Sequence, residues 1–182
     1  RGNPILPSVL AGSYKIFGYS YIPPRVFQSF IGSLTVLLMF ILARRLYGRW
    51  VSLLAGLALA VFPSLVYTAG VFYVDCLFTF LIVVTVYLLS IDPPSNGLRR
   101  MGLVAVSGIA LGITVLCRPI FFAYLPFAVL FMFFKFGENW PRRIAYALVM
   151  ASMAFLTIMP WTLRNYARYG RLLLVSTGSG LF

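Results

Sequence analysis

The sequence predicts an all-α protein that crosses the membrane several times. Of its 182 residues, 62% are hydrophobic and 10% are charged, and its mean hydropathy is +0.97. A typical soluble domain has about 25% charged residues, so this chain has too few of them to cover a water-facing surface. Backbone groups in lipid must pair within their own segment, and the apolar segments lack the alternating pattern of membrane β-strands. Helices are therefore expected throughout.

Six intervals without charged residues define the expected membrane spans. They cover residues 26–43, 50–74, 74–91, 101–117, 119–134 and 144–163. A helix that crosses the hydrocarbon core needs about 17–25 mostly apolar residues, and the intervals are near that length. The sequence therefore predicts a bundle of about six transmembrane helices over residues 26–163. Gly56 with Ala60, and Gly108 with Gly112, have the spacing that lets membrane helices pack closely.

The segments on either side of this bundle have a different composition. Residues 1–25 contain four prolines around a mixed stretch at 8–17, which predicts an interfacial helix at the end of an outer loop. Residues 164–182 are expected to begin another outer segment. Because the chain starts at Arg1 and stops after the Gly- and Ser-rich residues 176–180, we interpret it as a fragment of a longer protein.

Three short basic loops predict the orientation in the membrane. They cover residues 44–50, 92–100 and 137–143, and the positive-inside rule places such loops in the cytoplasm. The opposite ends of the spans then face outward from a plasma (inner) membrane. Eight basic residues fall on the expected inner side and seven on the outer side. Outward arginine is disfavoured, so this near-parity indicates that the outer face binds an anion such as phosphate.

Asp75 is one of three acidic residues in the chain, and it begins the third interval among apolar neighbours. In one interpretation, its charge is stabilised by the positive end of the helix dipole. In the other, the carboxylate accepts a proton from an attacking hydroxyl group or orients that group. The residues alone leave both interpretations open.

Three arginines on the expected outer side are candidates for binding phosphate. Arg118 stands between the fourth and fifth intervals, and Arg164 and Arg168 follow the sixth and share one face if that stretch is helical. A guanidinium group holds phosphate through paired donors and stays charged. Alternatively, these side chains extend to lipid headgroups at the ends of spans. Cys76 and Cys117 are the only cysteines and histidine is absent, so the sequence predicts no imidazole or thiolate metal site.

Several segments of the chain together resemble a known family. They are 25–36 (RVFQSFIGSLTV), 43–49 (ARRLYGR), 63–80 with its acid, 112–119, 161–166 (WTLRNY) and 175–177. In this order and spacing they are similar to the polyprenyl-phosphate-dependent membrane glycosyltransferases of the C-type fold, which include the protein mannosyltransferases and the aminoarabinose transferases. The resemblance covers nearly the whole chain.

The resemblance implies an enzyme that transfers a sugar from a polyprenyl-phosphate donor to an acceptor at the outer surface, with inversion at the anomeric carbon. It implies that the family's principal catalytic Asp precedes Arg1, so this fragment is expected to be inactive alone. Asp75 matches a second acid of the family, and Arg118, Arg164 and Arg168 match groups near the donor phosphate. The expected partners are the sugar donor, membrane lipid, and a lipid, polysaccharide or protein acceptor, and nucleic acid is not expected.

Two other classes of protein fit the same composition. A transporter or flippase would bind an anionic lipid with the same arginines and perform no chemistry. A structural membrane subunit would present them separately to headgroups. The sequence predicts no cofactor, and it does not indicate the sugar, the acceptor class, the oligomeric state or a need for a divalent metal ion.

Overall fold

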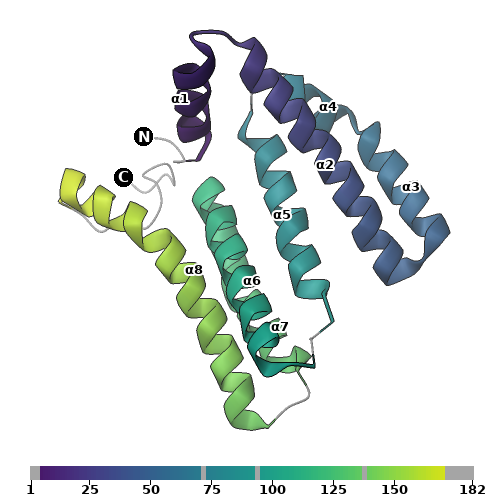
Figure 1. Cartoon of the computed structure of the whole chain (residues 1–182), viewed down its shortest axis with the longest axis vertical. Helices are drawn as coiled ribbons and strands as arrows, with labels where there is room; N and C mark the ends of the chain where they lie inside the picture. Colours follow the sequence, from purple (N-terminus) through teal and green to yellow (C-terminus); the bar gives the residue numbers. More distant parts are fainter. Residues whose placement is uncertain (1–4, 71–72, 93–94, 137–138, 171–182) are drawn as a thin grey trace. The chain divides into compact units, whose positions relative to one another are not determined.

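The computed structural model describes residues 5–70, 73–92, 95–136 and 139–170, and this part of the chain is helical and contains no strand. Its helices form two compact units, an N-terminal unit of Ile5–Tyr87 and a C-terminal unit that starts at Leu88. Figure 1 shows the helices in chain order. They are α1 (Ile5–Phe17), α2 (Ile22–Tyr47), α3 (Arg49–Ala60), α4 (Pro63–Gly70), α5 (Val74–Ser90), α6 (Gly97–Cys117), the 3₁₀ helix η1 (Pro119–Tyr124), α7 (Leu125–Lys135) and α8 (Trp140–Tyr169).

Helix α2 organises the N-terminal unit, where α1, α3 and α4 all pack against it. Its buried residues recur every three or four positions and form one stripe along the helix, as expected for a helix with one packed face. They are Pro24, Gln28, Ile31, Gly32, Thr35, Leu42 and Ala43. Gly56 of α3 packs beside Phe40 of α2, since a Cβ atom added to this glycine would lie 3.6 Å from the Cβ atom of Phe40. Gly56 is therefore in ordinary contact with α2, whereas Ala60, the other residue of the expected small-residue pair, is exposed.

The first turn of α2 includes Pro23 and Pro24, which the sequence analysis assigned to the outer loop. Proline is tolerated in a first turn because the backbone N–H that it lacks has no partner within the helix there. The structure therefore begins this helix four residues before the interval that starts at Val26. Helix α1 covers the whole of the stretch 8–17 that was expected to form an interfacial helix.

The second apolar interval is broken into two helices. Helices α3 and α4 meet at a bend of 47°. Pro63 begins α4, and a proline disfavours helical geometry in the residue before it, here Phe62. The single helix expected over residues 50–74 is therefore a bent pair.

The C-terminal unit is built on the close packing of α6 against α8. A Cβ atom added to Gly108 would lie 2.5 Å from the carbonyl oxygen of Met150, and one added to Gly112 would lie 2.8 Å from that of Ala154. Only glycine leaves room for backbones this close. The predicted packing role of Gly108 and Gly112 is confirmed, and the matched order of these contacts shows that α6 and α8 run parallel.

Between α6 and α8 the chain returns through η1 and α7. Pro126 lies in the first turn of α7, and the N–H of Leu125 bonds to the carbonyl of Phe122 in the 3₁₀ manner. The unit's core is a cluster of buried side chains from α5, α6, α7 and α8. Its members are Leu89, Val104, Leu111, Leu125, Ala128, Met132, Phe136, Tyr146, Met150 and Ala154.

Three helices of the described residues, α2, α6 and α8, are long and apolar enough to cross a membrane. The bent pair of α3 and α4 would make a fourth span if the two helices cross together. Helix α5 and the η1–α7 segment are apolar but shorter. Each apolar interval thus contains helix within the described part of the chain, which has the character of a multi-pass membrane protein.

Candidate functional site

Asp75 lies in the first turn of α5, directly after Val74, and its side chain is half-buried. Its backbone carbonyl accepts a hydrogen bond of 2.8 Å from Thr79 Oγ1, one turn further along the helix. A carboxylate in the first turn lies at the positive end of the helix dipole, which stabilises its charged form. The structure therefore places the acid where the sequence analysis expected it, at the start of an apolar helix.

The turn that carries Asp75 is held to α2 by Gln28. The side-chain Nε2 of Gln28 donates to the carbonyl of Tyr73 at 2.7 Å, and Cys76 Sγ donates to the backbone carbonyl of Gln28 at 3.4 Å. Both partners are close neighbours of Asp75 in the sequence. The sequence analysis missed Gln28, although a carboxamide inside an otherwise apolar interval is a signal for a structural or functional role.

Arg118 occupies the junction between α6 and η1 and is half-buried. Its backbone N–H closes α6 by donating to Thr114 at 3.1 Å, and its carbonyl accepts from Phe121 at 3.0 Å in η1. Val115 and Ile158 pack together one turn before it.

Arg164 and Arg168 lie one turn apart on α8, which runs through Pro160 to Tyr169. Because the stretch is helical, the two arginines share a face as expected. Both side chains are exposed, and the guanidinium carbon of Arg164 lies 4.4 Å from the ring centroid of Trp161. The sequence analysis missed this stacking. Figure 1 shows that α8 bends in its C-terminal part.

The predicted site residues are divided between the two units. Asp75 belongs to the N-terminal unit, and Arg118, Arg164 and Arg168 belong to the C-terminal unit. Within the C-terminal unit, the three arginines gather toward the end where α6 and α8 both have their C-termini. The opposite end of the pair is also basic, with Arg99 and Arg100 on α6 and Arg142 and Arg143 on α8.

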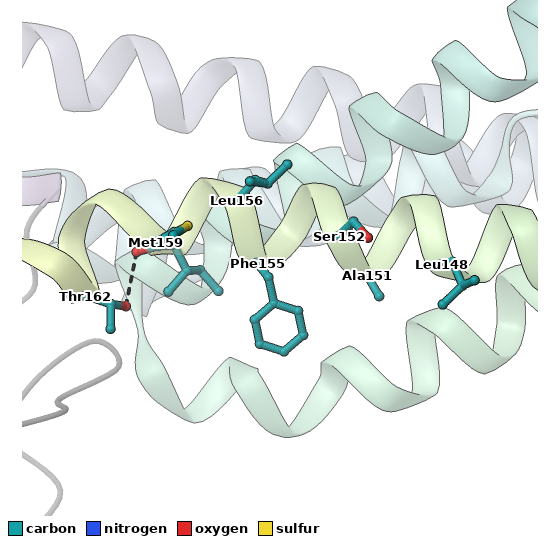
Figure 2. A pocket seen from close by; sticks show the side chains of 8 residues that line it. Leu148, Ala151, Ser152, Phe155, Leu156, Met159 and Thr162 are labelled. Carbon is teal, nitrogen blue, oxygen red and sulfur yellow. Dashed lines mark hydrogen bonds between the residues drawn. The ribbon is translucent and has the colours of Figure 1, made fainter.

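An apolar groove of about 550 Å³ runs along α8 (Figure 2). Its lining comes entirely from this helix and contains Leu148, Ala151, Ser152, Phe155, Leu156, Ile158, Met159 and Thr162. The Thr162 hydroxyl bonds within its own helix, to the carbonyl of Ile158 at 3.3 Å. The groove presents no charged side chain, so it suits hydrocarbon and not a phosphate group.

A smaller and more polar cavity of about 410 Å³ lies at the opposite end of the α6–α8 pair. Its lining includes Arg100 of α6, Arg142 of α8 and the ring of Tyr146. Arg100 also lies over the ring of Phe136, 5.6 Å from its centroid. These arginines come from two of the basic loops that were expected on the cytoplasmic side.

The described residues contain no group of three or more His, Cys, Asp or Glu side chains that could hold a metal ion. Cys76 and Cys117 are both buried and are not joined in a disulfide. Both cysteines therefore pack as small buried side chains. The candidate residues are one carboxylate in the N-terminal unit and three guanidinium groups in the C-terminal unit.

Taken with its apolar spans, the helical fold defines this chain as part of a multi-pass membrane protein. The family model described as dolichyl-phosphate-mannose-protein mannosyltransferase matches it over residues 2–163. The chain belongs to this family, as its sequence motifs predicted. No solved structure matches it.

Two curated relatives are aminoarabinose transferases. An undecaprenyl phosphate-alpha-4-amino-4-deoxy-L-arabinose arabinosyl transferase of Pseudomonas aeruginosa (strain UCBPP-PA14) is 27% identical over 163 residues, which cover 88% of this chain and 30% of the relative. An undecaprenyl phosphate-alpha-4-amino-4-deoxy-L-arabinose arabinosyl transferase 2 of Pseudomonas fluorescens (strain Pf0-1) is 27% identical over 158 residues, which cover 85% of this chain and 29% of the relative. The chain thus spans about 30% of the length of these relatives.

Proposed function

We propose that the protein containing this chain is an inverting glycosyltransferase that moves a sugar from a polyprenyl-phosphate donor to an acceptor at the outer membrane face. Family membership over residues 2–163 is the observation that carries the proposal. The relatives from two Pseudomonas species, both named as transferases for an undecaprenyl-phosphate-linked sugar, support the donor class. The acceptor is a lipid, a polysaccharide or a protein.

In this proposal the arginines of the C-terminal unit bind the donor phosphate. Negative charge grows on the phosphate as the glycosidic bond breaks, and fixed guanidinium groups stabilise that charge in the transition state. Arg118, Arg164 and Arg168 lie toward one end of the α6–α8 pair, and Trp161 orients Arg164 by stacking. The apolar groove on α8 shows that the same helix also offers a surface for hydrocarbon.

Asp75 acts on the acceptor or positions the reacting groups. A carboxylate can accept the proton of an attacking hydroxyl or amine, or it can orient that group. The proposed topology has six spans in a plasma membrane, with the three basic loops in the cytoplasm. In that topology Asp75 and the three arginines face outward.

Sugar transfer by the protein tests the proposal. The complete open reading frame that contains this chain is expressed and purified, and transfer of radiolabelled sugar from a polyprenyl-phosphate donor is followed. Replacing Arg164 by Gln removes one charge-assisted hydrogen bond to phosphate, which is worth about 1.5–3 kcal/mol. The donor KM is therefore expected to rise at least tenfold.

Arg99→Gln is a matched control, because Arg99 is an exposed arginine in the first turn of α6, at the other end of the α6–α8 pair. It is expected to leave the donor KM unchanged. Equal effects of the two substitutions would show that overall charge, and not phosphate binding at Arg164, controls donor use. A protein that carries the lipid-linked sugar across the membrane without breaking the sugar–phosphate bond would contradict the proposed chemistry.

A further inference from the structure

The carboxamide of Gln28 is buried and only half satisfied. Its residue is 2% exposed. Its Oε1 atom is buried and has no hydrogen-bond partner among the described residues. A buried acceptor without a partner lowers stability, whereas an apolar side chain of the same shape avoids that penalty. Packing alone therefore does not account for an amide at this position.

The donor side of the same amide explains its orientation. Nε2 lies 2.7 Å from the carbonyl oxygen of Tyr73. If the amide were turned over, its oxygen would face that carbonyl oxygen at the same distance, and the two would repel each other. The bond to Tyr73 thus fixes the amide and leaves Oε1 unpaired.

Gln28 also receives a bond on the other side of Asp75. The Cys76 thiol donates to the backbone carbonyl of Gln28 at 3.4 Å. One turn further along α2, a Cβ atom added to Gly32 would lie 3.7 Å from Cys76 Sγ, so α5 begins in contact with α2. One residue of α2 therefore holds the chain at Tyr73, directly before α5, and at Cys76, in the same first turn as Asp75.

We propose that Gln28 is a positioning residue, which fixes the first turn of α5 against α2 and thereby sets the place of the Asp75 carboxylate during sugar transfer. This inference rests on the proposed function. Displacing a reacting group by about 1 Å can reduce a rate by about a hundredfold. Two hydrogen bonds that bracket the acid are suited to preventing such a shift.

Gln28→Met in the complete protein tests the inference. Methionine has a similar length and no branch, so it fills the same space while removing both the unpaired acceptor and the donor to Tyr73. The melting temperature is expected to stay level or rise, while kcat for sugar transfer falls about tenfold and the donor KM is unchanged. A purely structural residue would not separate stability from turnover in this way.

A double-mutant cycle shows whether Gln28 acts through Asp75. In an Asp75→Asn background, Gln28→Met is expected to change kcat by less than about twofold, because residues that act as one unit are not additive. Thr35→Val is the matched control, since Thr35 is also fully buried on α2 and its hydroxyl bonds to Ile31 within the same helix at 2.8 Å. It is expected to leave kcat unchanged in both backgrounds.

Thiol labelling tests the contact itself and does not depend on enzymatic activity. In a Cys117→Ala background, the buried Cys76 is expected to react faster with a membrane-permeant maleimide in Gln28→Met than in the parent or in Thr35→Val. Unchanged labelling, or equal loss of kcat with and without Asp75, would overturn the inference. If the parent protein transfers no sugar, the proposed function fails. The labelling result still tests the contact between Gln28 and the start of α5. Faster labelling supports that contact, and unchanged labelling rejects it.

Discussion

The guanidinium group of Arg164 stacks over the indole ring of Trp161, one turn earlier on α8, with 4.4 Å between its central carbon and the ring centroid. Cation–π contacts of this kind restrict a long side chain that would otherwise sample many rotamers. Arg164 is exposed, so without the ring its charge would be spread over a wide volume. In the proposed function, this stacking would hold Arg164 in a defined place to meet the donor phosphate.

Trp161→Leu is therefore expected to weaken donor binding. The contact at an exposed site is worth about 0.5–1 kcal/mol, which corresponds to a rise of about two- to fivefold in the donor KM. Trp161→Phe keeps an aromatic face and should show a smaller rise. Steady-state kinetics with a polyprenyl-phosphate sugar measure both. A larger effect of Phe than of Leu would argue against stacking as the cause.

Gly108→Ala is expected to destabilise the C-terminal unit. The new methyl group would meet the Met150 carbonyl at 2.5 Å, so α6 and α8 would have to separate. Overpacking of this kind costs about 1–3 kcal/mol. Gly102→Ala on the same helix is the control, because a Cβ atom there meets nothing within 4 Å. Thermal unfolding in detergent should show a lower melting temperature for Gly108→Ala alone.

Lys135→Met is expected to loosen the end of α5. The Lys135 ammonium group donates to the carbonyls of Leu89, in the last turn of that helix, and Ile91, directly after it. Carbonyls at a helix C-terminus lack a partner within the helix. Hydrogen bonds from a charged donor contribute about 1.5–3 kcal/mol each. Faster amide hydrogen exchange over residues 86–92 would report the loss, and unchanged exchange would contradict it. Lys135→Arg should keep part of the protection.

The sequence predicted the location of the helices better than their continuity. Each of the six apolar intervals contains helix among the described residues, because intervals between charges reflect where the chain can enter lipid. They do not reveal breaks caused by proline inside an apolar run, so the bend at Pro63 was missed. At Pro23 and Pro24 the error was reversed, because a loop was expected where the structure has a helix. In the sequence alone, a proline in the first turn of a helix cannot be told from a proline that breaks one.

The candidate site was predicted in part. Asp75 and the three arginines were recognisable because a charge among apolar residues is conspicuous in any sequence. Gln28 carries no charge, and its importance depends on Tyr73 and Cys76, which lie more than 40 positions away in the chain. Contacts of this kind depend on how α2 and α5 pack, and no local pattern specifies that packing.

The rate of sugar transfer by the complete protein with Asp75 replaced by Asn tests the central claim most directly. Asparagine keeps the shape and some hydrogen bonding but cannot accept a proton, and general-base catalysis contributes about a hundredfold or more to rate. Single-turnover transfer from the polyprenyl-phosphate donor is therefore expected to slow at least a hundredfold, with donor affinity unchanged. Transfer at the parent rate would contradict this account, because it would remove the acid from the chemistry.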